Sequence, residues 1–172
     1  MELIPLHPGK YRDYPIDVHY TTDRVYAVKT SPWGFSLELT VLPQPEEHRF
    51  SGTLFSSWLE DPLAFGLRED GELLGIVEGS MESWHQLFRI SNIFVQPEHR
   101  GKGLGSILLK KMIAYARDLP YCRGVVLETQ TCNYPAICLY RKHGFRLCSI
   151  DTHAYSNHDI ETHEVRIDLF LE

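Results

Sequence analysis

A glycine-rich segment decides the fold. Residues 96–106 read Gln96-Pro97-Glu98-His99-Arg100-Gly101-Lys102-Gly103-Leu104-Gly105-Ser106. The segment follows an apolar stretch, Ile90 to Val95, and leads into a helical pattern, Ile107 to Ala116, which predicts a strand, a turn and a helix. Glycines let peptide N–H groups approach an anion without interference from Cβ, and the N–H groups that begin a helix carry partial positive charge. The segment therefore predicts a loop that binds a pyrophosphate.

The spacing of the glycines argues against two common phosphate-binding loops. A dinucleotide loop needs G-x-G-x-x-G with an acidic residue about 20 residues further on. A nucleoside triphosphate loop needs G-x-x-x-x-G-K-[ST]. The chain has Arg100-x-x-Gly103-x-Gly105 instead. A turn that binds no ligand is the remaining alternative. Three glycines at the start of a helix weaken the helix, however, so we expect ligand binding to compensate for their presence.

A second motif follows at a strand and helix further along the chain. The strand reads Val125-Val126-Leu127-Glu128-Thr129-Gln130, and Asn133-x-x-Ala136-x-x-x-Tyr140-x-x-x-Gly144-Phe145 comes after it. In this order, the two motifs resemble those of the GCN5-related N-acetyltransferase (GNAT) superfamily. The resemblance implies a mixed α/β fold over residues 1–172, in one domain. Its central sheet would be mostly antiparallel, splayed between the two motif strands and flanked by helices.

The resemblance also implies acetyl-CoA as the cofactor. Asn133 would meet the pantetheine arm, Ala136 would let the cofactor pass close to the helix, and the Tyr140 hydroxyl would lie beside the thioester sulfur. Without the glycine loop, Tyr140 would be read as a core residue of an amphipathic helix. The cofactor-binding residues implied are Ile93, Phe94, Val95, Arg100, Gly101, Lys102, Gly103, Leu104, Gly105, Ser106, Asn133, Ala136 and Tyr140.

Length, composition and charge agree with this reading. A chain of 172 residues with 43% hydrophobic residues can bury the core of one domain. No apolar run approaches the roughly 20 residues that span a bilayer, and the start, Met1 to Pro5, lacks the pattern of a signal peptide, so we expect a cytoplasmic protein without a membrane partner. The net charge of −6 disfavours nucleic acid and favours a cationic substrate.

Cysteines and histidines give no metal signal. The four cysteines lack C-x-x-C spacing and the nine histidines are scattered, so we predict reduced thiols and no metal. A monomer and a homodimer are both compatible with the sequence.

The remaining elements follow from periodicity and turn residues. Phe50, Leu54, Phe55 and Trp58 have helical spacing, which predicts a helix from Glu46 to Asp61. We predict strands at 24–29, 35–42, 64–68, 72–80, 87–95, 123–130, 146–155 and 164–171, turns at 31–34 and 69–71, and a helix at 134–143.

Acetyl transfer requires an amine that loses a proton and a thiolate that gains one. By resemblance, Tyr140 is the acid and the backbone N–H of Val95 polarises the thioester carbonyl. Many relatives carry a Glu base on the strand before the loop, where this chain has Ser91 and Asn92. Glu128 lies twelve residues before Tyr140, as does the base in bacterial enzymes that acetylate ribosomal-protein N-termini.

Glu128 is therefore the first candidate for the base, and burial beside the cofactor cleft would raise its pKa toward neutrality, as a general base needs. Its alternative role is to attract the ammonium group. Glu78, Glu82 and His85 are weaker candidates that would act through water.

The second half of the chain narrows the resemblance. Residues 124–130, the helix motif and Ser149-Ile150-Asp151-Thr152 with Tyr155 resemble the streptothricin acetyltransferases, over about Ile90 to Asn157. Those enzymes acetylate an amine in the β-lysine chain of the antibiotic, which implies a role in antibiotic resistance. Ser91-Asn92 departs from the acidic pair expected there, which puts streptothricin itself in question.

Three functions remain open. The first is acetylation of a small cationic amine, held by Glu128, Asp151, Tyr155 and Trp84. The second is acetylation of peptide or protein N-termini. The third is a sensor that binds acyl-CoA without catalysis, against which the presence of Tyr140 and Glu128 counts.

Overall fold

The computed structural model describes all 172 residues, which form two compact units. The first unit contains residues 1–19, 49–127 and 172, and the second contains residues 20–48 and 128–171. The single domain expected over residues 1–172 stays a prediction. None of the helices has the length and apolar composition needed to cross a membrane.

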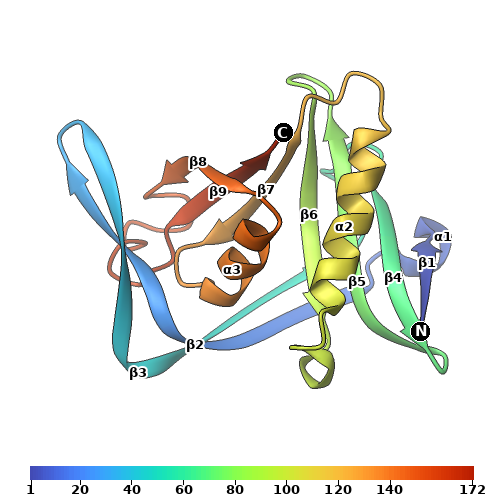
Figure 1. Cartoon of the computed structure of the whole chain (residues 1–172), viewed down its shortest axis with the longest axis horizontal. Coiled ribbons are helices and arrows are strands. Elements are labelled where there is room, and N and C mark those ends of the chain that lie inside the picture. The colour runs from blue at the N-terminus through green and yellow to red at the C-terminus, as the bar shows by residue number, and fades with distance from the viewer. The chain divides into compact units, whose positions relative to one another are not determined.

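The sheet of the first unit has the strand order β1-β4-β5-β6-β7 (Figure 1). Strands β1 (Glu2–Leu6), β4 (Leu63–Glu69), β5 (Glu72–Glu82) and β6 (Leu87–Val95) pair antiparallel in succession. Strand β6 then pairs in parallel with the start of β7 (Val125–Gln130). The β4–β5 turn has Asp70 at φ 49° and Gly71 at φ 88°, which is the backbone that Asp-Gly favours in a two-residue hairpin.

Helix α2 (Leu104–Arg117) lies against β5 and β6 (Figure 1). Its buried residues recur at helical spacing, so one apolar stripe faces the sheet; they are Leu104, Leu108, Leu109, Met112, Ile113 and Ala116. Gly75 permits this contact, because a Cβ there would lie 3.1 Å from Leu108 Cδ1 and 2.8 Å from the Phe94 carbonyl oxygen.

A second core cluster lies on the opposite face of the sheet and contains Ile76. Adjacent residues of a strand point to opposite faces, so the side chain of Ile76 points away from the face on which Gly75 meets α2. The short helix α1 (Pro8–Tyr11) contributes Tyr11 to the edge of this cluster. The cluster consists of Leu6, Ile16, Leu54, Phe55, Ala64 and Ile76. A 3₁₀ turn, η1 (Pro97–His99), leads from β6 toward α2.

The second unit contains the end of β7, helix α3 (Tyr134–Lys142) and the antiparallel pair β8 (Arg146–Asp151) and β9 (Arg166–Leu171). The strand order is β7-β9-β8. Asn133 begins α3, because its side-chain oxygen accepts a hydrogen bond from the Ala136 N–H at 3.3 Å. The helix buries Ile137 and Tyr140.

A long hairpin forms a separate two-stranded sheet from β2 (Pro15–Ser31) and β3 (Gly34–Thr53) (Figure 1). We call it the arm; its base, 15–19 and 49–53, belongs to the first unit and the rest to the second. The predicted strands and the turn at 31–34 are confirmed, but both strands are much longer than the alternation of residues indicated.

The predicted helix from Glu46 to Asp61 is wrong. Strand β3 continues to Thr53, and no helix follows before β4. The apolar side chains do not share one face: Phe50 and Trp58 are 47% and 71% exposed, whereas Leu54 and Phe55 are buried. Pairing with β2 overrides the helical spacing, and Phe55 has a left-handed backbone with φ 59° that a helix excludes.

The other sequence-based elements are found with shifted ends. Strand β6 has the bounds expected, whereas the strand expected to reach Tyr155 ends at Asp151. Strand β1 and helix α1 were not predicted. The fold class is confirmed: the chain has a mixed α/β fold with a mostly antiparallel sheet and flanking helices.

Candidate active site

The glycine loop presents a row of free peptide N–H groups. The N–H groups of Ser106 and Ile107 bond to the Gly103 carbonyl at 3.0 and 3.2 Å, whereas those of residues 101–105 have no acceptor within the protein. Gly101 and Gly103 have φ of 74° and 83°, and a Cβ on either would meet nothing of the protein within 4 Å. Five adjacent N–H donors without acceptors at the start of a helix, with open space at Gly101 and Gly103, fit a pyrophosphate group.

The side chain of Arg100 fastens this loop to two strands. Its Nε donates to the Val95 carbonyl at 3.0 Å, and its Nη1 donates to the His19 carbonyl at 2.5 Å. Burial lowers the pKa of Arg100, although a guanidinium stays charged at neutral pH. The guanidinium of Arg100, one of the implied cofactor-binding residues, is thus bound to main-chain oxygens of β6 and β2.

Strand β6 is no longer paired with β7 from Ser91 onward. Its ladder with β7 covers Phe88 to Ile90 only, whereas its ladder with β5 continues to Val95. A β-bulge lies at the same point, because Ile90 faces Gly79 and Asn92 faces Glu78, which leaves Ser91 without a partner. Ile93, Phe94 and Val95, predicted to contact the cofactor, follow directly after this opening.

A buried carboxylate occupies the bulge. Glu78 is fully buried on β5, and its Oε1 accepts a hydrogen bond from the Phe55 N–H. Its Oε2 accepts from Ser91 Oγ at 3.2 Å and from Asn92 Nδ2 at 2.6 Å. The neighbouring strand thus supplies an acidic group at the two positions where the sequence lacks one.

In the second unit, Tyr140 lies on α3 and is 5% exposed. Its ring packs against Phe145, with the ring centres 6.1 Å apart. Burial raises the pKa of the Tyr140 hydroxyl above its ordinary value, so the group holds its proton at neutral pH. These properties suit a proton donor.

Glu128 lies on β7 with its side chain 35% exposed. Its Oε1 accepts from the Tyr155 hydroxyl at 2.8 Å, and its Oε2 lies 3.2 Å from Arg166 Nε. The Tyr155 hydroxyl in turn accepts from Gln130 Nε2 at 2.8 Å. Burial raises the pKa of Tyr155, so it remains a donor to Glu128. Nothing in the sequence pattern pointed to Arg166.

The other proposed substrate residues are dispersed. Asp151, at the end of β8, accepts from the His153 N–H at 3.0 Å. Trp84 belongs to the first unit, in the β5–β6 turn, where it is 79% exposed and stacks on His85 with the ring centres 3.7 Å apart. Glu82, a weaker candidate for the base, is bound to Arg89 at 2.6 Å.

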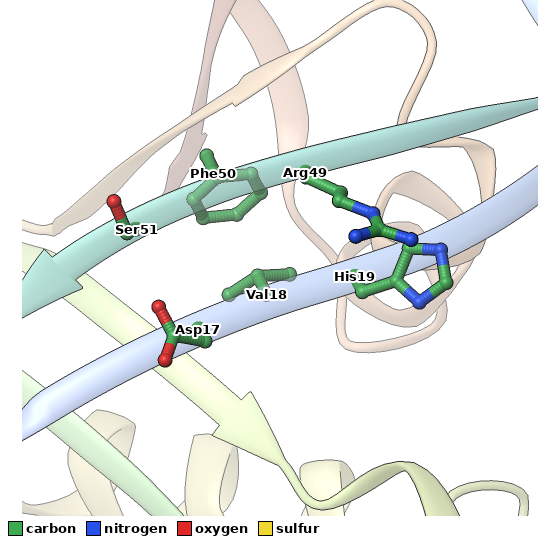
Figure 2. A pocket seen from close by; sticks show the side chains of 6 residues that line it. All are labelled: Asp17, Val18, His19, Arg49, Phe50 and Ser51. Atoms are coloured by element: carbon green, nitrogen blue, oxygen red, sulfur yellow. The ribbon is translucent and has the colours of Figure 1, made fainter.

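A pocket of about 390 Å³ lies at the base of the arm in the first unit (Figure 2). Three consecutive residues of each strand line it: Asp17, Val18, His19, Arg49, Phe50 and Ser51. Because the His19 carbonyl binds Arg100, the wall of the pocket is connected directly to the glycine loop. Sequence reasoning missed this pocket, because it placed Phe50 on a helix.

Residues 30–145 of this chain match the Acetyltransferase (GNAT) family. The chain therefore belongs to this family, whose members use acetyl-CoA, and it is an acetyl-CoA-dependent N-acetyltransferase. The free N–H groups of residues 101–105 fit the pyrophosphate of that cofactor.

Within the family, the chain is similar to streptothricin acetyltransferases. It is 32% identical to streptothricin acetyltransferase of Streptomyces lavendulae over 151 residues, which cover 81% of this chain and 78% of the relative. The crystal structure of nourseothricin acetyltransferase superposes with a TM-score of 0.77 at 28% identity, covering 99% of this chain and 96% of that one. A Bacillus anthracis structure assigned to the same group, in complex with acetyl coenzyme A, shares the fold with a TM-score of 0.74 at 18% identity, covering 100% and 98%.

Proposed function

We propose that this enzyme transfers the acetyl group of acetyl-CoA to a primary amine of a small cationic molecule of the streptothricin type. The observation that carries the proposal is the extent of the sequence similarity to the Streptomyces lavendulae streptothricin acetyltransferase. The similarity covers 81% of this chain and therefore extends beyond the cofactor motifs. The negative net charge of the chain also suits a cationic acceptor.

The chain's own groups have separate roles in this proposal. The N–H groups of residues 101–105 hold the pyrophosphate, and the side chains of Asn133 and Ala136 border the pantetheine arm. Bound acetyl-CoA supplies the acetyl group as a thioester. The Val95 N–H polarises the thioester carbonyl, and Tyr140, protonated because it is buried, gives its proton to the departing sulfur.

Glu128 has two possible roles, as base or as the group that attracts the ammonium ion. Its contacts support the second role more strongly. Both carboxylate oxygens already interact with Tyr155 and Arg166, and its side chain is partly exposed, where an arriving cation can approach it. Asp151, Tyr155 and Trp84 are proposed to bind other parts of the acceptor, by charge or by an aromatic face.

The test is a set of initial rates with acetyl-CoA and a panel of acceptors: streptothricin, lysine, polyamines, aminoglycosides and peptides with ribosomal-protein N-termini. Thiol release gives the rate, and mass spectrometry identifies the product. We expect acetylated streptothricin or another acetylated small amine. Activity on peptides alone would shift the function to protein N-terminal acetylation. Tight binding of acetyl-CoA without any turnover would indicate a sensor.

A further inference from the structure

Glu78 is a buried carboxylate with only neutral partners. It is 0% exposed, and the groups that bind it are the Phe55 N–H after β3 and the Ser91 hydroxyl and Asn92 amide of β6. Across the ladder on the other side, its partner is Ala64 of β4. A buried anion is costly to keep without a cationic partner, which calls for a reason beyond packing.

The bulge in β6 allows two adjacent side chains to contact the carboxylate of Glu78. Adjacent residues of a regular strand point to opposite faces, so Ser91 and Asn92 could not both reach one carboxylate oxygen. The extra residue at the bulge turns both side chains toward Glu78 Oε2. Glu78 is sealed from solvent, whereas both of these β6 residues are partly exposed.

The position of Ser91 connects this buried group to the reaction. Ser91 is the first residue of β6 beyond its ladder with β7, and Val95, the proposed partner of the thioester carbonyl, lies four residues further along the same strand. Ser91 therefore lies where β6 loses its β7 partner, and its hydroxyl contacts the carboxylate of Glu78 at 3.2 Å.

We propose that Glu78 is the proton acceptor for the attacking amine and that the Ser91 hydroxyl relays the proton. This inference rests on the proposed function and supplies the base that the proposed function leaves open. It also accounts for a chain that lacks an acidic residue at Ser91 and Asn92: the carboxylate comes from the neighbouring strand.

The step balances without another reactant. The protonated acceptor amine donates an N–H to Ser91 Oγ while the Ser91 O–H donates to Glu78 Oε2. The ammonium proton passes to Ser91 and the Ser91 proton passes to Glu78, which leaves a neutral amine whose lone pair forms the bond to the carbonyl carbon. The bond from that carbon to sulfur breaks, and the sulfur takes a proton from Tyr140. The acetylated nitrogen gives its surplus proton back to Tyr140, and release of the Glu78 proton through Ser91 to water restores the enzyme.

Asn92 provides a matched control within the same contact. It donates to the same oxygen as Ser91, but an amide nitrogen only donates, whereas a hydroxyl both accepts and donates. Loss of either side chain removes one hydrogen bond to Glu78. Only the loss of Ser91 breaks the proton path.

The experiment compares Ser91→Ala, Ser91→Thr, Asn92→Ala and Glu78→Gln with the wild type, using streptothricin and acetyl-CoA across a pH series. We expect Ser91→Ala and Glu78→Gln each to lower kcat by about 100-fold or more, which is the usual size of general base catalysis. The loss should be largest at low pH and shrink as pH approaches the pKa of the acceptor amine, about 10. Ser91→Thr should recover most of the activity, and Asn92→Ala should lose much less than Ser91→Ala.

Two measurements without turnover accompany the rates. Calorimetry should give the same acetyl-CoA affinity for Ser91→Ala and wild type. Amide hydrogen exchange at Phe55 should stay slow in Ser91→Ala and in Glu78→Gln, because the side-chain oxygen of glutamine can accept from the Phe55 N–H as Glu78 Oε1 does, which shows that both variants keep the local fold.

Three outcomes overturn the relay: wild-type kcat in Ser91→Ala, equal losses in Ser91→Ala and Asn92→Ala, or a loss in Ser91→Ala that is independent of pH. A wild-type enzyme that acetylates neither streptothricin nor any other small amine contradicts the proposed function instead. The Ser91 variants decide the matter even if Glu78→Gln does not fold.

Discussion

Tyr140 combines two properties that a proton donor needs at neutral pH. It is 5% exposed, and its burial raises the pKa of its hydroxyl. The sequence motif suggested the residue, but spacing alone also fits an ordinary core aromatic. The burial and the raised pKa, which only the structure provides, support the role as an acid.

Replacement of Tyr140 by phenylalanine removes the proton and keeps the ring that packs on Phe145. We expect kcat to fall by roughly 100-fold, with acetyl-CoA affinity within about twofold of wild type. Steady-state rates and calorimetry check this. Tyr121→Phe, at an 83% exposed position, is the control. Unchanged turnover in Tyr140→Phe would remove Tyr140 as the acid.

Glu128→Gln separates the two roles of this carboxylate. If Glu128 attracts the ammonium ion, the variant should raise KM for a cationic acceptor by about five- to tenfold, equivalent to roughly 1 kcal/mol, with kcat nearly unchanged. The effect should weaken at high salt. A loss concentrated in kcat and greatest at low pH would instead make Glu128 the base and contradict the assignment to Glu78. Glu161→Gln, at an exposed position of the same unit, is the control.

Residues that bind through backbone geometry could be found from the sequence, because glycines leave a clear pattern. The side chains that contact Glu78 and Arg166 could not be predicted from the sequence. Their contacts depend on strand register and on a bulge, which bring together residues 13 to 38 positions apart in the chain. The strand sequence around each of these residues carries no signal for that register.

At the scale of elements, the start of α2 depends on the left-handed conformation of Gly103. This residue is the N-cap of the helix with φ 83°. A β-branched residue rarely adopts this conformation, and its side chain would enter the open space at the loop where the pyrophosphate is expected. We expect Gly103→Val to abolish acetyl-CoA binding in calorimetry. Gly52→Val, at an open position of β3, should bind normally. Retained binding in Gly103→Val would contradict the assignment of the loop.

The pairing of β5 with β6 depends on Gly79 beside the bulge. A Cβ there would lie 2.5 Å from Phe88 Cε1 and 2.7 Å from the Arg89 carbonyl oxygen. Such crowding costs roughly 1–3 kcal/mol, so Gly79→Ala should lower the free energy of unfolding by this amount in a denaturant titration. Gly52→Ala meets no neighbour within 4 Å and serves as the control. Equal stability of the two variants would show that the bulge adapts.

Elements with strong local signals were predicted with nearly correct bounds, among them β6, α2 and α3. The segment from Glu46 to Asp61 failed because its apolar residues recur at helical spacing although the chain pairs with β2. The arm of 17-residue and 20-residue strands could not be foreseen, since its exposed strands lack a continuous alternation of buried and exposed residues.

At the scale of the whole molecule, stability should fall at alkaline pH. Burial raises the pKa of the Cys132 thiol from 9.0 to about 11, and the pKa of Tyr20, whose hydroxyl lies 3.3 Å from that thiol, is also raised. The folded state therefore binds these protons more tightly than the unfolded state does. The stabilisation is complete below about pH 9 and is lost as pH rises through about 11.

The midpoint of denaturant unfolding, measured between pH 7 and 11, should stay level to about pH 9 and then decline. Cys132→Ser serves as the comparison, because it removes the thiol that titrates. A midpoint that is constant to pH 11 would contradict the burial of these groups.

The most direct test of the central claim is an internal competition. Wild-type enzyme, limiting acetyl-CoA and equal concentrations of streptothricin and a peptide with a ribosomal-protein N-terminus are mixed, and mass spectrometry measures the two acetylated products. Their ratio equals the ratio of kcat/KM for the two acceptors. The account predicts that acetylated streptothricin predominates. Predominance of the acetylated peptide would contradict a small cationic amine as the acceptor.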